Sequence, residues 1–364
     1  MPLPHSYLED IAARLEPGMR EAFLKAVRAL RAQADPARIA ALLENGDVDG
    51  VLDAIGLNDP AWLNSFRAAM AEGFVAGGQE THAGVRGLII DAISQDILPP
   101  GSDARLLASF GIRNLPAEKA LRDYGMGLIR EIDDNTRDGV RTFLEDGMEA
   151  GRNPVQSALD LCGRIGESGE REGGILGLTE TQARSVQRAR DELASTDAPT
   201  LRRYLGRELR DRRYDAAVLR AIRSGEPIPE AIQEKAGTAY SNRYLRYRAE
   251  VMSRTESLRS ASVGQHAALL NAVATGALPY GSIRRFWMDT DDERTRVWHK
   301  EIPDLNPDGV SLEEPFVTPL GPLLYPRDPE GEAENIIQCR CWMQIRLTGS
   351  GNRWLDMLAF PVPG

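Results

Sequence analysis

The residues best suited to chemistry gather near the C-terminus of this 364-residue chain, between positions 286 and 345. An acidic cluster begins at Asp289 and is followed by His299, and the window closes on a Cys-Arg-Cys sequence at 339–341. Two of the three cysteines and one of the four histidines lie there. Such side chains can ligate a metal ion, exchange protons with a substrate, or hold one another by hydrogen bonds.

A zinc site is the first interpretation of this window. On a strand, the C-x-C spacing places the thiols of Cys339 and Cys341 on one side. With the imidazole of His299 and a carboxylate from Asp328 or Asp292, they would form a tetrahedral zinc shell. The next apolar positions of the strand would share that side, so ordinary buried thiols are the alternative. The residues alone leave both interpretations open.

A metal-dependent hydrolase is a second chemical hypothesis. Asp292, His299 and Asp328 could together activate a water molecule. No H-x-x-x-H, G-x-S-x-G or glycine-rich phosphate loop accompanies them. We expect His299 instead to be the hydrogen-bonded partner of an acid such as Asp292. The chain is therefore predicted not to be an enzyme, and the hydrolase is kept as the alternative.

The order of these residues resembles the C-terminal domain of the phage head morphogenesis family, the Mu F-like minor head proteins. The pattern W-x-x-T-x-D-x-R-x-R-x-x-H is followed by P-x-D-P and C-R-C, and R-T-E precedes it. Many relatives carry C-x-x-C where this chain has Arg296 and His299, which supports a metal by resemblance. The pattern is carried here by Arg254, Thr255, Glu256, Trp287, Thr290, Asp292, Arg294, Arg296, His299, Pro326, Asp328, Pro329, Cys339, Arg340 and Cys341.

The resemblance implies a virion component of a phage or a phage-derived particle. Such a protein would bind the portal protein and the major capsid or scaffold protein, and would act in head morphogenesis and in DNA packaging or ejection. It would be made in the host cytoplasm and then reside in the capsid interior. The R-T-E residues Arg254 and Glu256 are expected to join a helix to the C-terminal domain structurally.

Composition limits the remaining classes of function. The net charge of −10 argues against coating of nucleic acid, though a local basic stripe is compatible with it. Three cysteines make no disulfide framework, which favours a reducing compartment. The sequence shows no signal peptide and no apolar run of about 20 residues that could span a membrane.

One basic stretch could contact packaged DNA. Arginines crowd positions 181–223 with interleaved tyrosines, and such residues bind phosphates and stack on bases. Acidic residues between them favour salt-bridged helix faces instead. If the chain were a free DNA-binding protein, its DNA affinity would fall steeply with salt. The candidate contacts are Arg202, Arg203, Arg207, Arg210 and Arg213.

Helical spacing of apolar residues dominates the chain up to about position 275, and strand-like alternation follows. We therefore predict an α+β protein, with mostly α-helical N-terminal and central regions and a small α+β C-terminal domain with a few short strands. The expected ranges are a helical region at 1–98, a second at 103–237 with a flexible connector at 166–174, a long helix plus α+β domain at 238–349, and an extended tail at 350–364.

Two details of these helices bear on the site. A helix from position 60 is expected to end at Gly77-Gly78. In the long helix, Arg254 is predicted to lie within the apolar stripe, with Glu250 one turn earlier as its partner and Glu256 on the opposite side.

Overall fold

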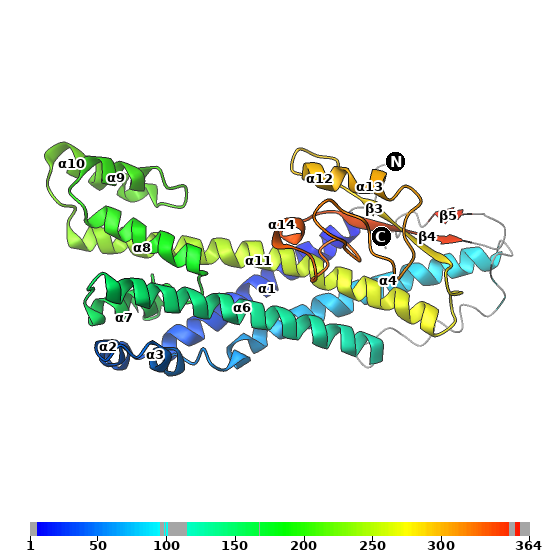
Figure 1. Ribbon diagram of the computed structural model, residues 1–364, viewed down its shortest axis with the longest axis horizontal. Helices are drawn as coiled ribbons and strands as arrows, with labels where there is room; N and C mark the ends of the chain where they lie inside the picture. The colour runs from blue at the N-terminus through cyan, green and yellow to red at the C-terminus, as the bar shows by residue number, and fades with distance from the viewer. Residues whose placement is uncertain are drawn as a thin grey trace. The chain divides into compact units, whose positions relative to one another are not determined.

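The structure is a computed structural model, and it describes residues 6–94, 98, 100, 115–166, 168–348 and 354–356. It is mostly helical with two small sheets (Figure 1), which confirms the predicted fold class. No helix in the described ranges is long and apolar enough to cross a membrane. The α-helices are α1 (Ser6–Gln33), α2 (Pro36–Glu44), α3 (Val48–Ala54), α4 (Asn64–Ser94), α6 (Leu115–Glu149), α7 (Pro154–Cys162), α8 (Glu180–Ala194), α9 (Ala198–Leu205), α10 (Asp215–Ser224), α11 (Glu230–Ala274), α12 (Val297–Lys300), α13 (Ile302–Leu305) and α14 (Ala333–Ile336).

Short 3₁₀-helices and strands complete the fold. The 3₁₀-helices are η1 (Pro60–Leu63) and η2 (Arg212–Tyr214). The strands are β1 (Arg164–Ile165), β2 (Arg171–Glu172), β3 (Ile283–Met288), β4 (Trp342–Thr348) and β5 (Trp354–Asp356).

The chain forms two compact units, each assembled from separate segments. The first unit comprises Met1–Arg20, Arg67–Gly127 and Val251–Gly364, and the second comprises Glu21–Phe66 and Leu128–Glu250. They do not follow the consecutive ranges expected from the sequence, because packing between distant segments decides them. The expected break after position 98 and most of the expected tail lie outside the described residues.

In the second unit, a buried loop at 173–178 is held by arginine side chains. Arg31 donates to two of its carbonyls at 2.7 and 3.0 Å, and Arg190 and Arg248 donate to one carbonyl each at 2.6 Å. Buried carbonyls need such donors, since no water reaches them. Because the side chains come from three different helices, the loop ties α1, α8 and α11 together within this unit.

Described residues of the expected connector at 166–174 take part in backbone pairing. Its flanks form an antiparallel hairpin, in which Arg164 pairs with Glu172 and Ile165 with Arg171. The backbone N–H of Gly173 then donates to Oδ1 of Asn242 at 3.0 Å. Composition alone gives no sign of this backbone pairing or of the buried loop at 173–178.

In the first unit, glycines allow α4 and α11 to cross closely. A Cβ atom at Gly264 would lie 2.1 Å from the carbonyl oxygen of Phe74, and one at Gly77 would lie 2.2 Å from that of Ala261. The prediction that the helix ends at Gly77-Gly78 was therefore wrong. These glycines face a neighbouring helix, and α4 continues through them.

The part of α11 at 255–265 is buried all round, polar residues included. Glu256 and Arg259 form an ion pair at 2.9 Å there, and both side chains are buried. Arg254, in contrast, is exposed. The predicted placement of Arg254 within the buried stripe was wrong, because the opposite side of the helix, which carries Glu256, is the buried one. Segments of the first unit cover this part of the helix from several sides, so a single apolar stripe does not mark its buried surface.

The three-stranded sheet of the first unit has the order β3-β4-β5, and both pairings are antiparallel. Alternate residues of β3 are buried, as the sequence predicts. β4 begins only at Trp342, so Cys339 and Cys341 precede the strand, although their buried positions keep its alternation. Part of the expected tail, residues 354–356, forms β5 on the edge of β4.

Candidate metal centre

A histidine and two cysteines come together in the first unit. Nδ1 of His299 lies 3.3 Å from Sγ of Cys341 and 3.6 Å from Sγ of Cys339. All three side chains are buried, with at most 2 % of their surface exposed, and their ligand atoms lie within 4.8 Å of one another. The structure thus confirms the predicted grouping of these residues, which could hold a metal ion.

Local backbone geometry brings the three side chains to one place. His299 lies on the single turn of α12. Between α14 and Cys339, Gln338 adopts a left-handed conformation with φ of 55°, and its N–H donates to Oγ1 of Thr255 at 3.2 Å. This bond anchors the Cys-Arg-Cys segment on α11, and it gives the middle residue of R-T-E a structural role.

The second nitrogen of His299 is held by an amide. Nε2 lies 2.8 Å from Oδ1 of Asn335, and Nδ2 of Asn335 lies 3.1 Å from Oγ1 of Thr318. With the amide oriented by Thr318, its oxygen accepts the Nε2 proton, and the lone pair of Nδ1 is left facing the thiols. Histidines that ligate metals are oriented by hydrogen bonds of this kind.

A buried arginine supports the cysteine segment from the other side. Arg327 donates to the carbonyls of Cys339 and Cys341 at 2.9 and 2.7 Å, and to Oγ of Ser262 at 2.8 Å. Burial opposes ionisation of Cys339, but a hydrogen bond with Cys341 and the charge of Arg327 help to bring the pKa of Cys339 below its ordinary value. The cluster is therefore suited to hold a thiolate, which is the form that binds metals.

The donor set fits a tetrahedral metal with thiolate and imidazole ligands. Zinc–sulfur and zinc–nitrogen bonds of about 2.3 and 2.1 Å at a tetrahedral angle separate the two donor atoms by roughly 3.5 Å. The distances from His299 to the two thiols bracket that value. A fourth ligand is not among the His, Cys, Asp and Glu side chains grouped with these three in the described chain.

The carboxylates predicted as a fourth ligand are used elsewhere, so that part of the prediction was wrong. Asp328 accepts the backbone N–H groups of Leu324 at 2.7 Å and Glu330 at 3.1 Å, which makes it the cap of a tight turn. Asp292 faces Arg340 instead of the thiols. The residues of the alternative hydrolase, Asp292, His299 and Asp328, therefore have separate partners.

Asp292 and Arg340 join the acidic turn to the Cys-Arg-Cys segment. Nη2 of Arg340 contacts both carboxylate oxygens of Asp292, which also accepts the backbone N–H of Arg294 at 2.9 Å. The hydrogen bond from Arg340 is the main reason that the pKa of Asp292 falls to about 2. The expectation that His299 pairs with an acid was wrong, since its partners are an amide and two thiols.

Two further pattern residues pack around the cluster. Trp287 is buried and meets the ring of His299 edge-on, with 5.7 Å between ring centroids. Nη2 of Arg296 donates to the carbonyl of Ile337, close to the cysteines in sequence. Most of the pattern residues from Trp287 to Cys341 therefore make contacts around the cysteine cluster and the Cys-Arg-Cys segment.

The sequence pattern predicts no role for Arg285, Arg327 or Asn335. Arg285 is fully buried and donates to the carbonyls of Ser311, Leu324 and Glu314, which fixes the long loop after α13. One sequence feature could have drawn attention to Arg327, which is the charged residue x of P-x-D-P. A charged side chain that becomes buried in a turn needs hydrogen-bond partners. No sequence signal separates Asn335 from an ordinary polar residue.

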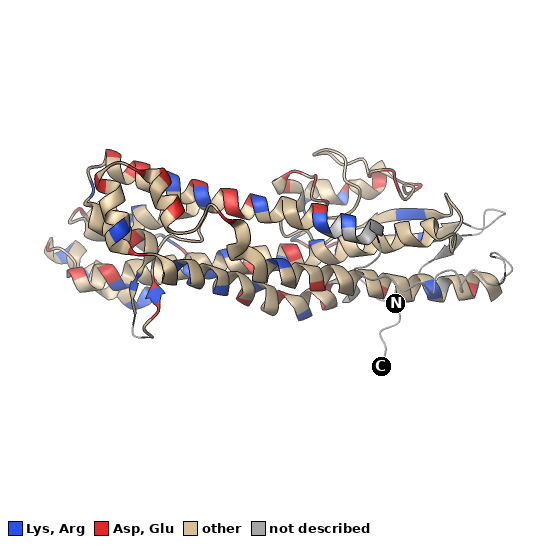
Figure 2. Ribbon diagram, turned by 90° about the horizontal axis from the view of Figure 1, so that it is seen from below, with Lys and Arg blue, Asp and Glu red and all other residues tan. Residues whose placement is uncertain are grey.

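The candidate nucleic-acid contacts lie in the second unit and are largely neutralised there. Three are paired with acids: Arg207 with Glu192 at 2.6 Å, Arg210 with Asp215 at 3.0 Å and Arg213 with Asp211 at 2.7 Å. Arg203 donates to Thr200, and Arg202 is exposed. Figure 2 shows basic and acidic residues interspersed along the helices. The pairing favours the interpretation as salt-bridged helix faces.

Comparison with known proteins gives no relative on which to base a function: no protein-family model, curated protein or solved structure matches the chain.

Proposed function

We propose that this chain is a minor head protein of a phage or phage-derived particle. In this role it binds the portal protein and the major capsid or scaffold protein during head morphogenesis, reaches the capsid interior from the host cytoplasm, and acts in DNA packaging or ejection. The observation that supports it is the set of contacts that pattern residues make in the C-terminal segment. Within that set, Asp292 bonds to Arg340, Arg296 to the carbonyl of Ile337 and His299 to Asn335, as expected of an architectural module.

The contacts of the acidic residues favour binding over hydrolysis. A hydrolase needs carboxylates and a base that converge on one water molecule. Here Asp292 is held by Arg340, Asp328 caps a turn, and His299 faces two thiols. The separate partners of these groups therefore favour the binding role over the hydrolase.

We also propose that His299, Cys339 and Cys341 bind a structural zinc ion. Two thiolates would balance the charge of Zn²⁺, and the ion would cross-link α12 to the segment before β4. Metal analysis of the purified full-length chain should find about one zinc per molecule, and C339S/C341S should lose it. C162S is the matched control, because Cys162 is a buried thiol outside the cluster. Equal zinc in C339S/C341S and in wild type would contradict the proposal.

Co-purification tests the head-protein function itself. The tagged chain is expressed in cells in which particle assembly is induced, and the captured proteins are identified by mass spectrometry. Portal protein and capsid or scaffold protein should be recovered with wild type and with C162S, and should be reduced with the unfolding-prone C339S/C341S. Assembled particles should also contain the chain. If a folded wild-type chain recovers none of these proteins and is absent from particles, the proposed function is wrong.

A further inference from the structure

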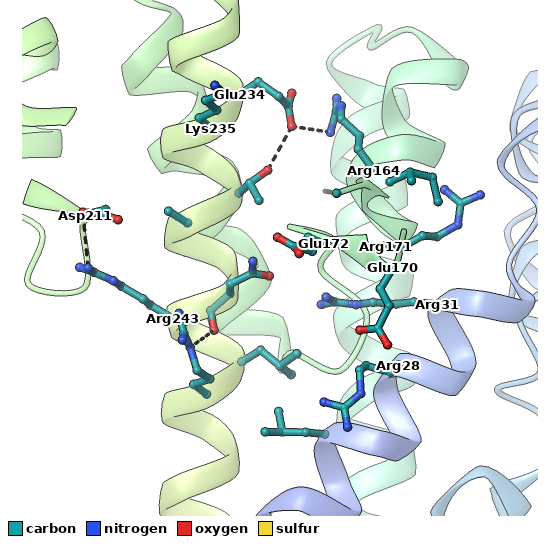
Figure 3. Close-up of a pocket in the computed structure, with 18 of the residues that line it drawn as sticks. Arg28, Arg31, Arg164, Glu170, Arg171, Glu172, Asp211, Glu234, Lys235 and Arg243 are labelled. Atoms are coloured by element: carbon teal, nitrogen blue, oxygen red, sulfur yellow. Dashed lines mark hydrogen bonds and ion pairs between the residues drawn. The ribbon is translucent and has the colours of Figure 1, made fainter. Parts of the chain in front are cut away.

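A cavity of about 1070 Å³ lies within the second unit, well away in sequence from the cysteine cluster. Residues of α1, of the β1–β2 hairpin, of η2 and of α11 line it (Figure 3). Eight basic and four acidic side chains contribute to its wall. The wall thus has an excess of positive charge, although the net charge of the whole protein is −10. The volume of the cavity is in the range that small-molecule ligands occupy.

Helical spacing builds this charged wall. Arg28 and Arg31 are three residues apart on α1, so they lie on one side of that helix. Lys235 and Arg246 are eleven residues apart on α11, which is close to three full turns and puts both on one side. Arg171 comes from the hairpin between these helices. In Figure 3, Arg28, Arg31 and Arg171 lie across from α11, which carries Lys235.

Half of the acidic side chains in the wall are already neutralised. Glu234 pairs with Arg164 at 3.0 Å. Asp211 pairs with Arg213 at 2.7 Å and lies 3.5 Å from Arg243. These two carboxylates contact three of the basic residues, so they do not account for the remaining cations.

Four cations of the wall have no carboxylate within pairing distance in the described chain: Arg31, Arg171, Lys235 and Arg246. Their contacts are with backbone carbonyls where they have any, as for Arg171 with Gly163 and Arg246 with Asn242. Glu170 and Glu172 offset only part of this charge. The cavity therefore carries positive charge that the protein itself does not compensate.

Arg31 is the most informative of these cations. Its side chain is only 3 % exposed, its Nη2 donates to two carbonyls, and its Nε has no hydrogen-bond partner in the described chain. Burial lowers the pKa of Arg31 to about 10. Buried charges in proteins are nearly always compensated by an opposite charge, and here an anion in the cavity would supply it.

We propose that this cavity binds the phosphate group of an anionic ligand, with Arg31 as its buried anchor and Arg171, Lys235 and Arg246 around it. Phosphate oxygens accept several charge-assisted hydrogen bonds at once, and guanidinium groups match them in shape. The phosphate belongs either to a free nucleotide or to the backbone of a nucleic acid. The site is independent of the head-protein function and of the metal centre.

Calorimetric titration of the full-length chain with inorganic pyrophosphate, at constant ionic strength, tests this site. Wild type should bind pyrophosphate saturably. K235Q/R246Q should bind it about tenfold more weakly, because Lys235 and Arg246 are exposed and both line the cavity. R220Q/R223Q is the charge-matched control, since both arginines are exposed on α10 outside the cavity. Its affinity should equal that of wild type, and thermal unfolding of each variant verifies folding.

Competition then identifies the source of the phosphate. Displacement of pyrophosphate by a nucleoside triphosphate, or by a short oligothymidylate, supports the site and distinguishes a free nucleotide from a strand. Three results would overturn the proposal: no saturable binding to wild type, an equal loss of affinity in both double variants, or equal displacement by sulfate at matched ionic strength.

Discussion

Asn335 orients His299 through a hydrogen bond of 2.8 Å between Oδ1 and Nε2, and this bond decides which nitrogen of the imidazole faces the thiols. The two residues are 36 positions apart in the sequence, so only the fold brings them into contact. The consequence is a histidine whose Nδ1 lone pair is fixed before any metal binds.

Replacing Asn335 should therefore weaken zinc binding. N335L removes the acceptor for Nε2–H and should lower zinc affinity about 10- to 100-fold, the usual effect of losing such a support. N335D keeps the acceptor and should bind zinc nearly as well as wild type. Competition against a chromophoric chelator measures both affinities. Equal affinity of N335L and wild type would show that the amide does not orient the ligand.

Arg327 should be essential for stability of the first unit. R327M leaves the carbonyls of Cys339 and Cys341 without their buried donor. Each unsatisfied buried group costs about 1–3 kcal/mol, so the free energy of unfolding should fall by about 3 kcal/mol. R294M is the control, since Arg294 is exposed beside the same cluster. Urea denaturation compares them, and similar midpoints for the two variants would refute the role.

Two glycine-to-alanine substitutions in the crossing helices α4 and α11 should change the free energy of unfolding in opposite directions. G264A places a methyl group 2.1 Å from the carbonyl oxygen of Phe74 and should lower the free energy of unfolding by several kcal/mol. Gly87 lies on α4, the other helix of the crossing, and has open space around its Cβ position. G87A should therefore raise stability by about 0.5–1 kcal/mol through helix propensity. Thermal unfolding of the two variants checks the contrast. Stabilisation by G264A would show that the helices do not pack this closely.

The R-T-E sequence should be sensitive at its glutamate and tolerant at its arginine. Glu256 accepts a hydrogen bond from the hydroxyl of Tyr124 at 2.7 Å and pairs with buried Arg259. E256A leaves that arginine buried without its partner, which costs about 3–5 kcal/mol. R254A changes an exposed residue and should alter stability by less than about 0.5 kcal/mol. Chemical denaturation measures both losses of stability. A larger loss in R254A than in E256A would contradict the prediction.

His266 should make the first unit less stable in acid. Burial, and then the charge of Arg285, lowers the pKa of His266 from 6.5 to about 3. The unfolded chain takes up the proton near pH 6.5 and the folded chain only near pH 3, so stability falls as the pH drops through this window. The slope is up to about 1.4 kcal/mol per pH unit.

H266F keeps an aromatic ring against Tyr325 and removes the titrating group. In wild type the centroids of the His266 and Tyr325 rings are 5.1 Å apart. The difference in free energy of unfolding between pH 7.5 and pH 4.5 should therefore be smaller in H266F than in wild type. Denaturation curves at the two pH values measure it. Equal differences would show that His266 does not carry this pH dependence.

Local patterns determined much of this protein. Helical spacing placed most helices, and Asp35 before Pro36 marked the start of α2, where its carboxylate accepts the N–H of Ala37. Residue types and the C-x-C spacing selected His299, Cys339 and Cys341 as one cluster. These features depend on backbone geometry over a few residues or on chemistry that few side chains possess, so the sequence is sufficient for them.

The tertiary structure alone decided which polar groups are buried and what they bind. Glu256 is buried and Arg254 exposed, Gly77 is a contact instead of a helix end, and Asp328 caps a turn instead of ligating a metal. The buried arginines that hold the loops, Arg31, Arg285 and Arg327, bond to carbonyls far away in sequence. Any residue can supply a backbone carbonyl, so no pattern along the chain marks these partners, and they become definite only when the distant segments pack together.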